Sequence, residues 1–240
     1  MRVTGRVSVA ALAEEFAVAA ETIRRDLLLL ERRGLLRRVY GGALPVDPIM
    51  AEPEITARAQ MMAEEKRRIA VAALAELPDG GSIFIEGGST PAALAEALPP
   101  DRRLTVVTTG LLVALALARQ PNLTVLAVGG RVRTRTLATV EDWAQQVLAG
   151  VHVDVAFLGT NGLDVHAGLT TPDTAEAAIK RLALSVGRRS VLLADHTKIG
   201  AVSMCRYGDL PDVDVLITDN GAAADTIEAL AATGLKVVTA

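Results

Sequence analysis

The stretch "SIFIEGGST", residues 82–90, contains the pattern that decides the fold of most of the chain. Ile83, Phe84 and Ile85 are consecutive apolar residues, as in a strand that is buried on both faces of a sheet. A Gly-Gly pair and a Ser-Thr pair follow, which predicts a tight turn and then a helix from about Thr90. Such a unit is typical of domains in which strands and helices alternate.

The same unit recurs as far as the C-terminus. Apolar strands are predicted at 104–109, 123–128, 153–159, 190–195, 214–219 and 236–240, and helices are predicted to begin at about Leu111, Val140, Thr174 and Ala223. Apolar strands that alternate with helices indicate an α/β fold with a parallel sheet covered on both faces. In such sheets ligands bind beyond the carboxyl ends of the strands.

Small, polar and charged residues follow the predicted strands, in the segments 87–90, 108–110, 129–133, 159–164 and 195–198. The segment "GGST" (87–90) offers bare amides, hydroxyls and a helix N-terminus, which suit a phosphate group. It could equally form a plain turn and helix cap. Lys198, which follows another strand, favours an anionic small molecule, although a lysine of a surface loop is the alternative.

Composition excludes several classes of protein. The chain has 240 residues, is 50% hydrophobic and has a net charge of −3, and no stretch of eighteen residues is free of polar interruption, so we expect no membrane span. The N-terminus lacks an adequate signal-peptide core and Cys205 is the single cysteine, which favours a cytoplasmic protein. The three histidines are scattered, so neither a metal site nor a cofactor is expected. Trp143 and Tyr207 are expected to pack in the protein.

Positive charge is concentrated near the N-terminus. Residues 1–45 contain eight arginines and five acidic residues, a net charge of +3, which leaves −6 for the rest of the chain. A basic segment on an acidic protein favours contact with a polyanion.

The basic segment has the pattern of a winged helix-turn-helix. Ser8 is a good N-cap for a first short helix, and a second helix is predicted from Glu21 to about Arg33, before Gly34. Next, "LLRRVYGGALPV" (35–46) predicts two strands joined by a Gly-Gly turn, which is a wing. A solvated surface would explain any one of the arginines, but together they favour DNA. The residues predicted to contact DNA are Thr22, Arg24, Arg25, Arg37 and Arg38.

This segment resembles the N-terminal signature of the DeoR family of bacterial transcriptional regulators, mainly through "TIRRDL" (22–27) and "GGA" (41–43). The resemblance implies that the second helix is the recognition helix. The chain has Ala19 where the family usually has a capping Ser, and Tyr40 where His is usual. The family also has a helix before the segment that begins at Gly5, so the first helix of this domain is expected to be missing.

The rest of the chain resembles the C-terminal sensor domain of the same family, through "GGST", "GGRVR", "AFLGTNGLD", "GLTTPDTAEAAIK" and "LLADHTK". The resemblance implies a fold like that of ribose-5-phosphate isomerase and a phosphorylated sugar or related metabolite as effector. Glu86 and Pro91 replace the commoner Asp and Thr. The effector contacts implied by the resemblance are Gly88, Ser89, Thr90, Thr109, Asn161, Asp164, Glu176, Lys180, Asp195 and Lys198.

Together these features predict a DNA-binding domain at 1–46, a proline-punctuated linker at 47–53 and an effector-sensing α/β domain at 54–240. This domain is predicted to begin with one helix from Glu54 to Leu77, in which residues 65–68 are solvated. We expect a repressor of carbohydrate-metabolism genes that acts as a homo-oligomer, a dimer or tetramer, with this helix as a candidate contact.

Two alternatives stay open. One is an isomerase-like enzyme, in which Glu176 and Asp164 would supply carboxylates, although the neutral Asn161 stands where an acid would be needed. The other is a sensor that has lost DNA binding.

Overall fold

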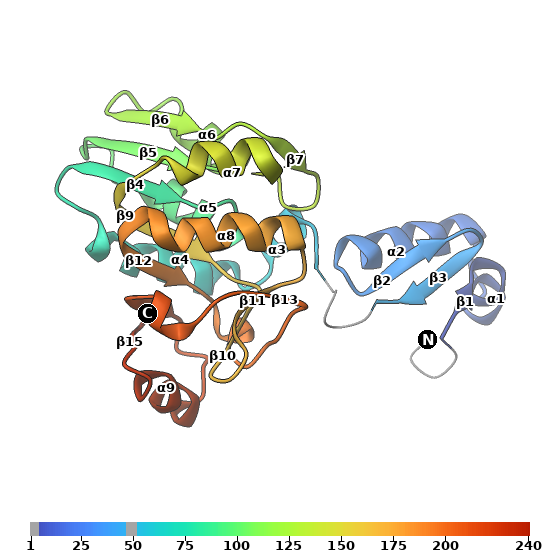
Figure 1. The fold of residues 1–240 in the computed structure, drawn as a ribbon. Helices are drawn as coiled ribbons and strands as arrows, with labels where there is room; N and C mark the ends of the chain where they lie inside the picture. Colours follow the sequence, from blue (N-terminus) through green and yellow to red (C-terminus); the bar gives the residue numbers. More distant parts are fainter. Residues whose placement is uncertain (1–4, 47–51) are drawn as a thin grey trace.

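A computed structural model describes residues 5–46 and 52–240 of the chain (Figure 1). We call residues 5–46 the head and residues 52–240 the body; Figure 1 shows the head standing to one side of the body. None of the helices in these two ranges is both long and apolar enough to cross a membrane.

The head contains two helices and a three-stranded antiparallel sheet. Its elements are β1 (Val7–Ser8), α1 (Val9–Glu15), α2 (Ala20–Arg32), β2 (Leu36–Val39) and β3 (Gly42–Pro45), with the sheet order β1-β3-β2. The Oγ of Ser8 accepts a hydrogen bond of 3.0 Å from the amide of Ala11, so Ser8 caps α1 as predicted. The small core consists of Ile23, Leu27, Leu36 and Ala43.

The body is built on a seven-stranded sheet with the order β15-β14-β12-β9-β4-β5-β6, in which every pair of neighbours is parallel. This confirms the predicted α/β fold. The strands are β4 (Gly81–Ile85), β5 (Leu104–Thr108), β6 (Leu123–Ala127), β9 (Val153–Gly159), β12 (Gly187–Leu193), β14 (Val215–Thr218) and β15 (Lys236–Thr239).

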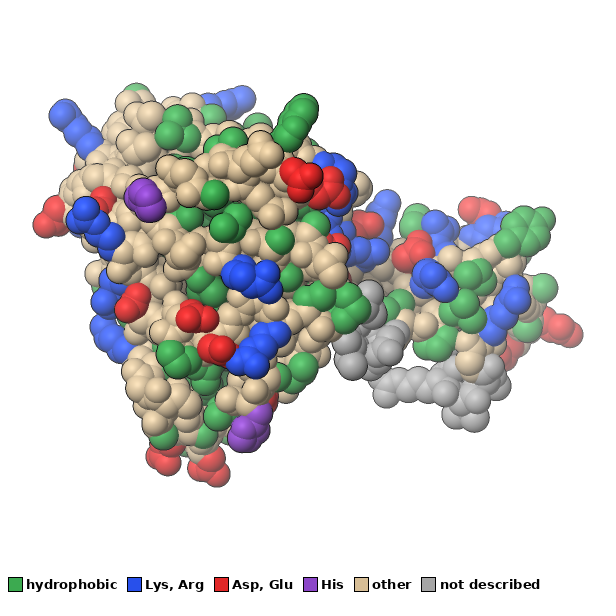
Figure 2. Space-filling view, viewed as in Figure 1, with side chains coloured by type: hydrophobic (Ala, Val, Ile, Leu, Met, Phe, Trp, Pro, Cys, Tyr) green, Lys and Arg blue, Asp and Glu red, His purple; other side chains and the backbone are tan. Residues whose placement is uncertain are grey.

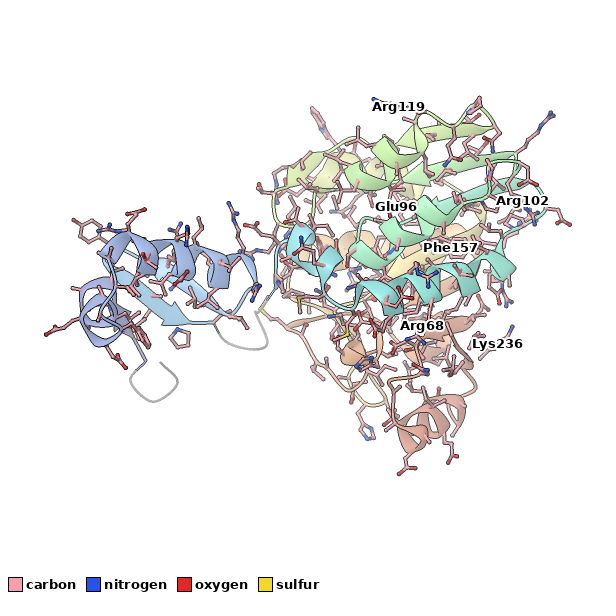
Figure 3. All side chains as sticks on the ribbon, turned by 180° about the vertical axis from the view of Figure 1, so that it is seen from behind. Arg68, Glu96, Arg102, Arg119, Phe157 and Lys236 are labelled. Carbon is pink, nitrogen blue, oxygen red and sulfur yellow. The ribbon has the colours of Figure 1, made fainter. Side chains whose placement is uncertain are left out.

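Helices cover both faces of this sheet. Helices α7 (Glu141–Ala149) and α8 (Thr174–Val186) lie in front of it in Figure 1, whereas α4 (Ala63–Ala73) and α5 (Ser89–Ala97) lie in front in the reverse view of Figure 3. Alternate side chains of one strand enter different cores: Phe84 joins the core under α7 and α8, and its neighbours Ile83 and Ile85 join the other. Helices α6 (Leu111–Leu117) and α9 (Ala224–Ala231) complete the layers.

The single helix predicted from Glu54 to Leu77 is wrong. The structure has α3 (Ile55–Gln60), a break at Met61 and Met62, then α4 and a 3₁₀ turn, η2 (Leu74–Glu76). Met62 has a left-handed φ of 52°, which no α-helix contains. The Nζ of Lys66 donates to the carbonyl oxygens of Arg58 and Met61, so it satisfies carbonyls at the end of α3 that have lost their helical partners.

Short strands outside the main sheet were not predicted. They are the hairpin of β7 (Arg131–Arg133) and β8 (Ala138–Val140), and a small sheet of β10 (Gly162–Asp164), β11 (Gly168–Thr171) and β13 (Cys205–Gly208); two 3₁₀ turns, η3 (His196–Lys198) and η4 (Leu210–Asp212), flank β13. Tyr207 is buried as predicted, but Trp143 is 76% exposed, so the prediction that it packs in the protein is wrong.

Candidate functional site

A cavity of about 110 Å³ lies at the carboxyl ends of β4, β9 and β12, which are neighbours in the middle of the sheet. This is the edge at which α/β sheets hold their ligands. Its wall comes from the residues after these three strands and from two helical segments, α3 to α4 and α8.

One wall of the cavity is the N-terminus of α5. Gly88 is the N-cap residue and has no side chain to bond the first amides of the helix. Ser89 and Thr90 follow, each 7% exposed, so their hydroxyls lie in a site largely screened from solvent. Helix N-termini with free amides attract anions.

The cavity is also lined by three basic residues, Arg58, Lys66 and Lys198. Burial lowers the pKa of Lys66 to about 8, with Lys198 and Arg58 adding to the effect and Asp195 opposing it. The pKa of Lys198 is lowered for the same reasons, burial first and then the charge of Arg58. An anion that enters the cavity would offset the burial of the two ammonium groups and so favour their charged forms.

The prediction that residues 65–68 are all solvated is wrong for one of them. Lys66 is 4% exposed and its Nζ lies 3.8 Å from the carboxylate of Asp195. Lys66 lies in the first turn of α4, where its ammonium group is held by the carbonyl oxygens that the break leaves without helical partners.

Two of the residues that line the cavity, Glu86 and Lys180, form a buried ion pair. The Nζ of Lys180 lies 2.6 Å from Oε1 of Glu86 and also donates to the carbonyl oxygen of Gly159 over 2.9 Å. The other carboxylate oxygen of Glu86 accepts the amide of Gly159 at 2.8 Å. Burial raises the pKa of Glu86, and Lys180 opposes this rise. The ammonium group also lies 5.4 Å from the centre of the Tyr207 ring.

The other carboxylates of the wall have partners as well. Oε1 of Glu176 accepts the hydroxyl of Thr136 at 2.5 Å and lies 3.2 Å from the guanidinium of Arg133. Asp195 accepts the amide of Thr197 at 3.1 Å, which starts the turn η3. Each acid that lines the cavity is therefore engaged by a cation or a hydrogen-bond donor.

Eight of the ten predicted effector contacts line this cavity, and two do not. Thr109 is buried behind the wall, where its Oγ1 lies 3.4 Å from the amide of Gly87. Asp164 lies at the end of β10, where its carboxylate accepts the amides of His166 and Ala167 and so closes a turn. The predicted residues that the structure brings together are Gly88, Ser89, Thr90, Asn161, Glu176, Lys180, Asp195 and Lys198.

Arg58 and Thr197 line the cavity although neither was predicted to do so, and Lys66 lines it although it was predicted to be solvated. Arg58 and Lys66 lie eight residues apart, on either side of the break in the predicted helix. A signal was available for Lys66, because it is one of only four lysines in this arginine-rich chain. We find no sequence signal for Arg58, because nothing local predicts the break.

The predicted DNA contacts lie on α2 and β2. Thr22 is partly exposed, and Arg24 and Arg25 are exposed on α2, where Arg24 forms an ion pair of 2.8 Å with Glu21. Arg25 has no acidic partner among the residues that the structure describes. In Figure 2 basic, acidic and hydrophobic side chains lie close together on the head.

The two wing arginines have different surroundings. Arg37 lines a cleft between the head and the body, and the guanidinium of Arg38 lies 2.7 Å from Glu31. Partial burial would raise the pKa of Glu31, but the hydrogen bonds and charge of Arg38 lower it. Tyr40 at the tip of the wing is fully exposed.

Family models match both parts of the chain. The DeoR C terminal sensor domain matches residues 61–220, and the DeoR-like helix-turn-helix domain matches residues 1–48. The chain belongs to the DeoR family. It is therefore a DNA-binding transcriptional regulator with a sensor domain, as the sequence predicted.

Curated relatives cover nearly the whole regulator. The HTH-type transcriptional regulator GlpR of Haloferax volcanii is 37% identical over 231 residues, 96% of this chain and 90% of the relative. The glycerol-3-phosphate regulon repressor of Escherichia coli K12 is 33% identical over 215 residues, 90% and 85% of the two chains. The putative aga operon transcriptional repressor of E. coli O157:H7 is 30% identical over 240 residues, which are 99% of this chain and 89% of the relative.

Among solved structures, the body is similar to ribose 5 phosphate isomerase A from Neisseria gonorrhoeae. The TM-score is 0.41 at 21% identity, and the match covers 57% of this chain and 53% of the isomerase.

Proposed function

We propose that this DeoR-family regulator is a repressor of carbohydrate-metabolism genes and that a phosphorylated sugar or a similar metabolite controls it. The observation that carries the proposal is the cavity itself, which is lined both by the N-terminus of α5 and by Arg58, Lys66 and Lys198. A helix N-terminus and three basic side chains in one cavity suit a phosphate group with a polar body attached.

The eight predicted residues that line the cavity are the proposed effector contacts, together with Arg58 and Lys66. Thr109 is proposed to act indirectly, by holding the amide of Gly87 beneath the effector. Asp164 is proposed to shape the loop after β10.

Thr22, Arg24 and Arg25 are the proposed readers of DNA on α2, and Arg37 and Arg38 the proposed phosphate contacts of the wing. Arg25 supports this assignment most strongly, because it is exposed and lacks an acidic partner in the described part of the head. The domain boundaries that we propose are those of the sequence analysis, 1–46, 47–53 and 54–240; residues 47–51 lie outside the described residues.

The enzyme alternative is less well supported. An isomerase needs a carboxylate that is free to move a proton between carbon atoms. Glu176 pairs with Arg133, Glu86 pairs with Lys180, and Asp164 closes a turn. These partners favour binding of the metabolite without conversion.

Pairing of two heads on a palindromic operator requires an oligomer, so we also propose that the regulator is a dimer or tetramer. The body has exposed apolar side chains at Trp143 and Val147, four residues apart on one side of α7. They are a second candidate contact besides the α3–α4 segment.

The experiment is a fluorescence-anisotropy titration of the purified chain with the duplex that lies upstream of its own coding sequence. We expect tighter binding than to a scrambled duplex of equal length, with affinity that falls steeply as salt rises. A thermal-shift screen of sugar phosphates identifies the effector, because stabilisation grows with ligand concentration relative to its Kd. Conversion of any of these compounds at a catalytic rate would instead support the enzyme.

A further inference from the structure

A cluster of ion pairs surrounds Glu52, in the segment that joins the head to the body. Glu52 is 3% exposed. Its Oε1 lies 3.4 Å from a guanidinium nitrogen of Arg58, and its Oε2 lies 2.6 Å from one of Arg133. The backbone carbonyl oxygen of Glu52 accepts a hydrogen bond from the guanidinium of Arg135. The backbone carbonyl oxygen of Arg135 in turn accepts a hydrogen bond of 2.8 Å from the amide of Ile55. A connecting residue is thus held by three arginines.

Two of these arginines also reach the effector cavity. Arg58 lines it directly. Arg133 lies 3.2 Å from Glu176, which lines the cavity through α8. Burial alone would lower the pKa of Arg133, but hydrogen bonding to Glu52 and the charges of Glu176 and Glu52 raise it, so the guanidinium stays charged between the two acids.

On its other side the same segment rests on the end of the recognition helix α2. The amide of Glu54 donates to the carbonyl oxygen of Arg32 over 2.8 Å. Gly34 packs closely against the backbone of Glu52. A Cβ atom at position 34 would lie only 2.8 Å from the carbonyl carbon of Glu52. Figure 1 shows β7 and α3 at the edge of the body that faces the head, and in Figure 2 basic and acidic side chains gather there.

We propose that Glu52 is the residue through which occupancy of the cavity changes the position of the recognition helix. The inference rests on the proposed function, because it concerns regulation through the same cavity. An anion in the cavity attracts Arg58 and competes with Glu52 for its guanidinium. Glu52 then re-pairs with Arg133 alone, and its backbone transmits the shift to Gly34 and Arg32. The coupling therefore depends on the charge of Glu52.

The first test needs neither DNA nor effector. Amide hydrogen exchange is measured over residues 29–36 of the full chain for wild type, Glu176→Gln, Glu52→Gln and the double variant. We expect Glu176→Gln to change exchange in this segment by about fivefold or more, and to have no such effect in the Glu52→Gln background. Glu141→Gln is the control, because it breaks an exposed ion pair of 2.6 Å between Glu141, at the start of α7, and Arg131 of β7. Equal exchange in wild type and Glu176→Gln overturns the proposal.

The second test measures operator affinity with and without 10 mM of a probe, sn-glycerol 3-phosphate or ribose 5-phosphate, chosen by its thermal shift. Wild type is expected to change affinity by about fivefold or more and Glu52→Gln by less than about twofold, while both bind the probe. An unchanged response in Glu52→Gln overturns the inference. Failure of wild type to bind its operator at all counts against the proposed function, and the exchange experiment still decides the coupling.

Substitution of Gly34 tests the same contact without changing any charged residue, and substitution of Gly5 is its control. Gly34→Ala and Gly5→Ala impose the same backbone strain, since φ is 69° and 67°, but only at Gly34 would the new methyl group meet the backbone of Glu52 and Pro53. We expect Gly34→Ala to weaken the response of operator affinity to the probe and Gly5→Ala to leave it unchanged. Equal responses in both variants contradict the contact path.

Discussion

The ammonium group of Lys66 donates to the carbonyl oxygen of Arg58 over 2.7 Å, across the break between α3 and α4. This contact ties the ammonium group of Lys66 to the backbone of Arg58, which also lines the cavity. Since Lys66 also lies 3.8 Å from Asp195, one lysine joins the α3–α4 segment to the end of β12.

Effector binding is expected to depend on pH through Lys66. Its pKa of about 8 means that the ammonium charge is lost as pH rises from 7 to 9, and Lys198 shifts in the same direction. We expect the Kd for a phosphorylated sugar to rise over this range in wild type. The variant Lys66→Arg, which keeps its charge, should show a weaker dependence in calorimetric titrations at pH 7 and 9.

The same lysine gives a prediction for stability with a definite sign. The unfolded chain keeps this proton up to a pH near 10.5, whereas the folded chain releases it near 8. The unfolded state binds more protons between these values, so the contribution of Lys66 to the unfolding free energy rises with pH across that window. Denaturant titrations at pH 7.5 and 9.5 should show this rise in wild type relative to Lys66→Met. The opposite sign would mean that Lys66 is stabilised as a cation.

Arg25→Ala is expected to weaken operator binding by about tenfold or more, because a side chain that reads a base contributes about 1–3 kcal/mol of binding free energy. Arg119→Ala is the matched control, since Arg119 is exposed on the body (Figure 3). Anisotropy titrations over a salt series also separate two roles of Arg25. If the slope of log affinity against log salt concentration falls in magnitude by about one, Arg25 contacts a phosphate. If the sequence preference changes, Arg25 contacts a base. Equal affinities for the two variants would remove Arg25 from the interface.

Ala19→Ser is expected to stabilise the head by about 1 kcal/mol. Ala19 is the N-cap residue of α2 with extended backbone angles, φ −64° and ψ 143°, and it has no side-chain hydrogen bond. A serine hydroxyl there can accept an amide of the first turn, as Ser8 does for α1. Amide exchange in α2 should slow in Ala19→Ser, and Ser8→Ala should speed exchange in α1. No slowing in α2 would show that another group already satisfies these amides.

Lys180→Met is expected to lower the unfolding free energy of the body by about 3–5 kcal/mol, because it leaves the carboxylate of Glu86 buried without its cation. Both side chains are nearly inaccessible, at 5% and 3% exposure. The double variant Glu86→Gln, Lys180→Met should lose much less than the single variant. Urea denaturation of both variants measures the difference, and equal losses would show that the pair does not act as a unit.

Local pattern predicted most of the architecture. The apolar runs at 83–85 and 153–159 fall on β4 and β9, and the helices predicted from Thr174 and Ala223 begin within one residue of α8 and α9. Strand and helix periodicities are properties of neighbouring residues, and the parallel order follows from their alternation. The same reasoning places the cavity at the carboxyl ends of the strands.

The sequence by itself determined the α/β body, the winged head and the edge of the sheet at which a ligand site forms. Only the tertiary structure decided that the helix after Glu54 breaks at Met62, that Lys66 is buried and that Asp164 closes a turn. It also decided that Glu52 is held by arginines from α3 and β7. The physical reason is that these features depend on charges and carbonyl groups that are far apart in the sequence and that only folding brings together.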